Sequence, residues 1–236
     1  MHDVEINLAA WQSSLMANIP LGGLFSRNET AYKWKATFRC WMLHESVLWR
    51  LHDLLTQSVA LHRQGHGLGA RILLRSGFET LATLIYLNQL MHQVLDGTLN
   101  FHDFDEKTRR LTVGSKNKST KIESINIMTI LGKCEQRYPG IAKIYANLSE
   151  SAHPSYQGLC VGYSKIDHDE YDTIFSNRWM ELYGDNHLGM VELCMETFEA
   201  EYNDIWGDLM KKLEDWIEAN DDELEATKPA DGEARP

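Results

Sequence analysis

A charged pair lies inside the most apolar stretch of the chain. Arg75 and Glu79 are four residues apart, and residues 72–87 around them are mainly aliphatic and aromatic. Because a charge is costly to remove from water unless it is paired and hydrogen-bonded, the pair indicates a structural or functional use for both side chains. Arg71 precedes Arg75 by another four residues, so the three side chains fall near one face of a helix.

A second ladder of polar residues repeats this spacing. Tyr145, Ser149 and His153 are also four residues apart. If the two helices pack side by side, they bring guanidinium, carboxylate, hydroxyl and imidazole groups together. Arginine in such a cluster could bind an anion, and histidine could transfer protons because its ordinary pKa lies near neutrality. The predicted catalytic residues are Arg75, Glu79 and His153, and the predicted substrate-binding residues of the ladders are Arg71, Tyr145 and Ser149.

The same residues also fit a purely structural role. Ion pairs with this spacing are common on helices, and a buried polar network can fix the register of two helices without doing chemistry. In that interpretation Arg75 and Glu79 neutralise each other, and His153 caps the end of its helix. The sequence leaves both interpretations open.

Charge is distributed unevenly along the chain. Residues 1–140 hold 16 basic and 12 acidic side chains, whereas residues 141–236 hold 7 basic and 22 acidic ones. The basic segment, residues 107–121, contains six basic residues and no acidic one. Such a segment could bind phosphate groups, with Lys116 and Lys118 as substrate contacts. A solvated loop is the alternative, because no aromatic residue within the segment could stack on bases.

The sequence shows no pattern of disulfides, of secretion, of membrane insertion or of cofactor binding. Its four cysteines are widely scattered, which is typical of reduced thiols rather than of disulfides or a zinc site. The first residues do not resemble a secretory signal, and the longest uncharged run is too short and too polar to span a membrane. We therefore expect a cytoplasmic protein that does not contact membranes. No ligand spacing or dinucleotide motif indicates a metal or another cofactor.

The pattern of apolar residues predicts an all-α fold, a helical bundle with long first, second and C-terminal helices. The chain has only five prolines, and Ser26 and Glu29 fit a capping box before the first long helix. Long helices are expected to end near residues 64, 95 and 219. The apolar stripe of the last one could pack within its own domain or form a dimer seam. Shorter helices are predicted within 99–112, 120–137 and 141–152, and a short strand is considered at 159–163. The expected organisation is an N-terminal extension over 1–25, one helical domain over 26–220 and a disordered acidic tail over 221–236.

Two motifs carry a resemblance to known families. The Arg75-Ser-Gly-Phe-Glu79 helix and the segment from Tyr145 through Leu148, Ser149 and His153 to Pro154 resemble a widespread bacterial family of helical proteins of unknown function. That family shows an R-x-x-x-E helix and a Y-x-x-L-S-x-x-x-H-P segment. The arrangement is also similar to HEPN domains, helical bundles of toxin–antitoxin and phage-defence systems. Many HEPN domains are ribonucleases, so the resemblance implies a HEPN-like fold and RNA as a substrate.

The HEPN resemblance also implies a catalytic signature. Catalytic members carry an arginine four to six residues before a histidine, and His153 has no arginine at that distance. The only match is Arg39 with His44, on the first long helix, and chance alone predicts a match of this kind. An arginine from another helix, Arg71 or Arg75, could still complete the chemistry. Ribonuclease-like activity is therefore left open.

The leading hypothesis is a helical component of a bacterial defence or toxin-like system that acts on or binds RNA. One alternative is a non-enzymatic interaction or regulatory protein, with a protein partner or a second copy bound through the C-terminal helix. Another is a sensor of a small anionic ligand that uses the same polar cluster.

Overall fold

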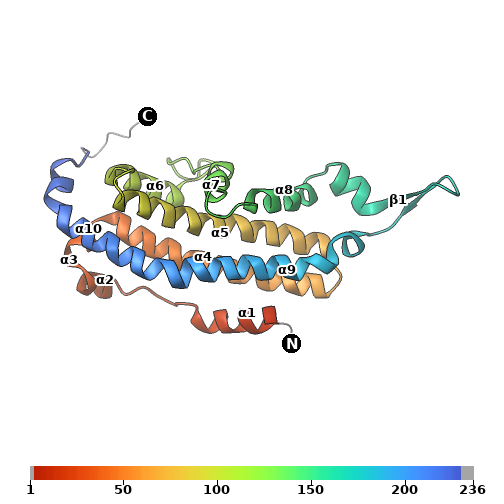
Figure 1. Ribbon diagram of the computed structural model, residues 1–236, viewed down its shortest axis with the longest axis horizontal. Coiled ribbons are helices and arrows are strands. Elements are labelled where there is room, and N and C mark those ends of the chain that lie inside the picture. The colour runs from red at the N-terminus through yellow and green to blue at the C-terminus, as the bar shows by residue number, and fades with distance from the viewer. Residues whose placement is uncertain (1–2, 230–236) are drawn as a thin grey trace. The chain divides into compact units, whose positions relative to one another are not determined.

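The computed structural model describes residues 3–229, and the all-α prediction is confirmed for them (Figure 1). One two-stranded hairpin is the exception among the described residues. The elements in chain order are α1 (Asp3–Ser14), α2 (Leu21–Arg27), α3 (Glu29–Tyr32), α4 (Lys35–Arg63), α5 (Gly67–Leu95), α6 (Phe101–Val113), α7 (Ile127–Cys134), α8 (Ile141–Ala152), the π-helix η1 (Tyr156–Val161), β1 (Ser164–Asp167), β2 (Asp172–Phe175), α9 (Trp179–Glu199), the π-helix η2 (Ala200–Ile205) and α10 (Trp206–Ala226).

The first long helix, α4, begins at Lys35, later than predicted, and the short helices α2 and α3 precede it. Asn28, rather than Ser26, caps α3, because its side-chain oxygen accepts a hydrogen bond from the backbone N–H of Ala31 at 2.8 Å. Ser26 belongs to α2 and donates to the carbonyl of Gly22. The predicted break between α4 and α5 is present, and Gly65 adopts a left-handed backbone with φ of 79° there.

Residues 156–175 contain the irregular elements that the sequence did not define. The strand considered at 159–163 is wrong, since those residues lie in or directly after the π-helix η1. The strands follow later, and β1 pairs antiparallel with β2 so that Ser164 lies opposite Phe175. Tyr171, in the turn between them, has a positive φ of 57°.

The C-terminal helix is longer than predicted and is interrupted. It starts at Trp179, passes through η2 and ends at Ala226, so it enters the segment for which disorder was predicted. The rest of that predicted tail, residues 230–236, lies outside the described residues. Val191, Phe198 and Leu209, all members of the predicted apolar stripe, are at most 1% exposed. The stripe therefore packs within this chain in the structure.

Contacts divide the chain into two compact units, whereas the sequence predicted one helical domain. Unit 1 is the described part of residues 1–15, 47–82 and 131–198. Unit 2 is the described part of residues 16–46, 83–130 and 199–236. Both units draw on the long helices α4 and α5, which is why neither is continuous in sequence.

Close helix packing builds the core of unit 1. Leu51, Leu55 and Leu74 are fully buried, and a Cβ atom added to Gly77 would lie 3.2 Å from Leu55 Cδ2. Gly77 therefore lets α5 approach α4 closely. Cys194 of α9 is buried and would lie 4.0 Å from the same Cβ.

Aromatic residues build the core of unit 2. The Trp34 ring lies 5.2 Å from the ring of Phe101, which in turn lies 6.0 Å from that of Trp216. An ion pair of 2.8 Å between Arg39 and Asp105 joins α4 to α6. None of the helices in the described part of the chain is both long and apolar enough to cross a membrane.

Candidate functional site

The arginine cluster of unit 1 forms where α5 lies beside α8 (Figure 1). The Arg75 Nε donates a hydrogen bond to Ser149 Oγ at 2.9 Å, and its Nη2 donates to the Tyr145 hydroxyl at 2.5 Å. Glu79 Oε1 lies 3.1 Å from Arg75 Nη2 and accepts a 2.8 Å hydrogen bond from the Tyr145 hydroxyl. The structure thus brings together four of the predicted site residues.

Helical spacing explains why these side chains meet. Arg75 and Glu79 are one turn apart on α5, and Tyr145 and Ser149 are one turn apart on α8, so each helix presents a matched pair. The Arg75 and Glu79 side chains remain 23% and 27% exposed, whereas Tyr145 is buried. Burial first, and the Glu79 carboxylate second, raise the pKa of Tyr145, so its hydroxyl stays a hydrogen-bond donor at neutral pH.

His153 does not join this cluster. Its backbone N–H donates to the carbonyl of Ser149, but its φ and ψ of −99° and 148° are extended, so α8 ends at this residue. Pro154 accounts for the change, because the residue before a proline is disfavoured in the α region. The His153 side chain is exposed, and in residues 3–229 no hydrogen bond connects it to Arg75 or Glu79.

Arg71 lies one turn before Arg75 and is only 1% exposed. Its Nε donates to Ser151 Oγ at 2.7 Å, and its Nη2 donates to Asn147 Oδ1 at 2.8 Å. The guanidinium also stacks on the Tyr183 ring, 3.9 Å from the ring centre. Its Nη1 is buried without a hydrogen-bond acceptor, and no carboxylate of the described chain forms an ion pair with this arginine. Burial lowers the pKa of Arg71.

A buried histidine pair lies in the same unit. His187 Nε2 is 3.0 Å from Ser58 Oγ, and that hydroxyl donates its hydrogen to the carbonyl of Ala70 at 2.8 Å. Ser58 must therefore accept from His187, which places the proton of the neutral ring on Nε2. The Nδ1 atoms of His187 and His62 are both buried without a partner, and the two rings stack with centres 4.8 Å apart.

The surroundings keep this pair uncharged at neutral pH. Burial, followed by the nearby His62 and Arg71, lowers the pKa of His187 from its ordinary value of 6.5 to about 4. Burial also lowers the pKa of His62. A guanidinium that has no carboxylate partner therefore shares unit 1 with two imidazoles that are disfavoured as cations. Arg71 Nη1 is thus a buried donor without an acceptor, and the unprotonated Nδ1 of His187 is a buried acceptor without a donor.

The sequence did not reveal that Tyr183 contacts Arg71, or that Ser58 and His187 are hydrogen-bonded in the same unit. Tyr183 and His187 do show the same four-residue spacing as the predicted ladders, and that signal could have drawn attention to α9. The pairing of Ser58 with His187 has no such signal, because the two residues lie on helices far apart in the sequence.

The other predicted contacts, Lys116 and Lys118, belong to unit 2 and not to the unit of the arginine cluster. Both side chains are exposed in the loop between α6 and α7. Arg109 is held by Glu106 at 2.6 Å, and Arg110 donates to the carbonyl of Glu123 at 2.9 Å. Part of the basic segment therefore shapes the loop, and the lysines face solvent.

The Arg39–His44 match to the ribonuclease signature does not form a paired site. Arg39 donates to Asp105, whereas His44 is buried, stacks 3.7 Å from the Tyr202 ring and lies 2.8 Å from Glu45 Oε1. Residues five apart on a helix project in different directions, which explains the separate partners.

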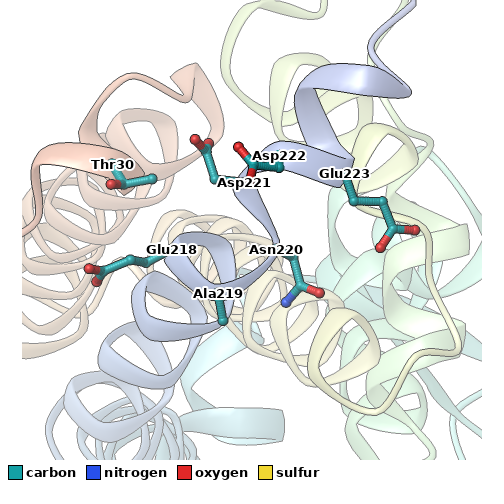
Figure 2. Close-up of a pocket in the computed structure, with 7 residues that line it drawn as sticks. All are labelled: Thr30, Glu218, Ala219, Asn220, Asp221, Asp222 and Glu223. Atoms are coloured by element: carbon teal, nitrogen blue, oxygen red, sulfur yellow. The ribbon is translucent and has the colours of Figure 1, made fainter.

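Figure 2 shows a pocket of about 340 Å³ in unit 2, at the end of α10. Two of its four acidic residues, Asp221 and Glu218, have structural partners. Asp221 accepts hydrogen bonds from Lys33 at 2.5 Å and from Trp34 Nε1 at 2.9 Å, and Glu218 accepts one from Asn28 at 2.9 Å. These hydrogen bonds connect residues 28–34, which include α3, to α10. Within residues 3–229, no group of three or more side chains is arranged to hold a metal ion. The lining residues are Thr30, Glu218, Ala219, Asn220, Asp221, Asp222 and Glu223.

Comparison with known proteins adds no relative: no family model, curated protein or solved structure matches the chain. The likeness to helical families of bacterial defence systems therefore rests on the two sequence motifs and stays a hypothesis.

Proposed function

We propose that this protein binds a small anionic ligand, through a phosphate or carboxylate group, at Arg71 and Arg75, and that it acts as a sensor rather than as a ribonuclease. The observation that carries the proposal is the state of Arg71, a guanidinium that is 1% exposed, has an unpartnered Nη1 and has no carboxylate counter-ion in the described chain.

The buried Arg71 guanidinium has no ion-pair partner among the described residues. Burying an ion is costly unless an opposite charge and full hydrogen bonding offset the loss of water. An oxyanion would supply both, because its oxygens match the planar fork of donors on arginine. Arg75 lies one turn away and is partly exposed. Within the described residues, its hydrogen bonds use Nε and Nη2 but not Nη1. It is therefore a candidate for first contact with the ligand.

Binding is favoured over catalysis because no imidazole of the described residues joins the cluster, and imidazole is the side chain best suited to proton transfer near neutrality. His153 is exposed and lies outside it, and the environment disfavours protonation of His187. Tyr145 remains protonated, which suits a hydrogen-bond donor rather than a general base.

RNA binding by a component of a bacterial defence or toxin-like system is the second candidate. It is favoured by the exposure of Lys116 and Lys118, which leaves both charges available to phosphates. An RNA mobility-shift assay on the wild type and on the Lys116→Glu, Lys118→Glu double variant tests it. Loss of a shifted band in the variant supports this candidate, and identical binding by both proteins counts against it.

The experiment for the anion site is a thermal-shift titration with inorganic phosphate, acetate and nucleoside phosphates. At ten times Kd, mass action stabilises the fold by about 1.4 kcal/mol, which raises Tm by about 3–6 °C for a chain of this size. Arg71→Met should abolish the shift. Arg109→Met, which removes the same charge from unit 2, is the matched control and should retain it. Failure of every anion to stabilise the wild type would refute the proposal.

A further inference from the structure

The hairpin of unit 1, residues 164–175, exposes an unusual amount of apolar surface. Tyr171, Phe175 and Ile166 are 93%, 79% and 60% exposed. Ser164 pairs with Phe175 and Ile166 pairs with Thr173, so Ile166 and Phe175 share one face of the hairpin. Figure 1 shows the hairpin extending away from α8 and α9 of its own unit. Two strands alone are marginally stable in water, and clustered exposed apolar groups indicate a contact surface.

The charge of the hairpin specifies what such a contact must provide. Its twelve residues include Lys165 as the single Lys or Arg, against four acidic side chains. Asp167 and Asp172 lie directly opposite each other, an arrangement that destabilises a strand pair. A partner surface must therefore combine positive charge with apolar side chains. The acidic residues are Asp167, Asp169, Glu170 and Asp172.

The basic segment of unit 2 has this combination. Lys116, Lys118 and Lys121 are exposed, and Val113 beside them is 42% exposed. Met128, at the start of α7, is 59% exposed. A backbone hydrogen bond of 2.8 Å between residues 115 and 122 gives the loop a defined shape. Positive charge and apolar area thus occur together on this surface, as negative charge and apolar area do on the hairpin.

We propose that the hairpin of one copy of this chain docks on the basic segment of a second copy. Each copy carries a net charge of −11, so two copies repel at long range and only a local match of opposite charge can bring them together. Contact would cover Phe175 and Ile166 and would relieve the repulsion between Asp167 and Asp172. At about 0.1 M salt the Debye length is about 10 Å, so the long-range repulsion is screened while opposite charges in direct contact still attract each other. High salt weakens that attraction as well and should dissociate the copies.

Charge reversal tests this pairing. Sedimentation equilibrium on nuclease-treated protein is run from micromolar to near-millimolar concentration, at about 0.1 M and at high salt. The wild type should exceed the mass of one chain at about 0.1 M salt and should dissociate at high salt. The Asp169→Lys, Glu170→Lys variant and the Lys116→Glu, Lys118→Glu variant should each stay monomeric, because each places like charges in contact. An equimolar mixture of the two should recover the dimer.

A matched control and an apolar variant complete the test. Lys211→Glu, Lys212→Glu reverses two charges on α10 and should associate as the wild type does. Phe175→Ser should weaken association at least tenfold while leaving the circular dichroism spectrum unchanged. A wild type that is monomeric under every condition, or reversed variants that dimerise alone and gain nothing on mixing, would overturn the proposal.

Discussion

The buried histidine pair makes the stability of this protein depend on pH in a direction that the structure specifies. His187 is 2% exposed, and its pKa falls from an ordinary 6.5 to about 4 in the folded chain. Between these two values the unfolded chain holds a proton that the folded chain does not. The stabilising contribution of neutral His187 is therefore complete above pH 6.5 and is lost as the pH falls toward 4.

The size of the effect follows from the two pKa values. At pH 5 the unfolded state gains about 2 kcal/mol relative to the folded state from this residue alone, and at pH 8 it gains almost nothing. Urea unfolding at both pH values gives the free energy of unfolding of the wild type and of His187→Gln. Glutamine keeps a donor for Ser58 and does not titrate. The wild type should lose about 2 kcal/mol more than the variant between pH 8 and pH 5.

His66→Gln, which removes an exposed imidazole, controls for the substitution itself. Burial also lowers the pKa of His62, so part of the pH dependence will remain in His187→Gln with the same sign. If the wild type and His187→Gln lose the same stability on acidification, the ring is not held neutral in the fold. The assignment of the His187 proton to Nε2 alone would then be wrong.

Three substitutions give further checks by urea unfolding at neutral pH without added anions. Arg71→Met should change the free energy of unfolding by less than about 1.5 kcal/mol, because removing a buried charge without an ion-pair partner offsets the lost hydrogen bonds. A loss above about 3 kcal/mol, roughly that of a broken buried ion pair, would contradict this expectation. Tyr145→Phe should cost about 1–2 kcal/mol, since its hydroxyl joins Arg75 to Glu79, and an unchanged value would show that the link contributes nothing. Gly162→Ala should cost about 1–3 kcal/mol, because the new Cβ would lie 2.5 Å from the buried Trp179 ring; a stabilised variant would show that the ring can move.

Spacing along single helices was enough to predict part of the site. Arg75 and Glu79 lie on α5 at the interval of one helical turn, as do Tyr145 and Ser149 on α8, and the four side chains meet. The same rule placed His153 on the second ladder, but it applies only while the helix continues. Pro154 ends α8, and its local effect on the backbone outweighs the periodic pattern.

Contacts between distant segments could not be predicted in this way. Ser58 and His187 are joined by a hydrogen bond whose partners come from α4 and α9, and one sequence contains no signal that pairs these helices. The hairpin was not predicted, for a different reason. Ile166, Ile174 and Phe175 are apolar but exposed, so their strand pattern does not mark a buried face. The length of the C-terminal helix was underestimated because an acidic composition resembles that of a disordered tail even where Leu224 is buried.

In the proposed function, a ligand supplies the counter-ion that Arg71 lacks within residues 3–229. Isothermal titration calorimetry with inorganic phosphate tests it most directly, on the wild type, Arg71→Met and the control Arg109→Met. The wild type and Arg109→Met should each bind one phosphate per chain with saturation, whereas Arg71→Met should bind none. Equal binding by Arg71→Met and the wild type would contradict it.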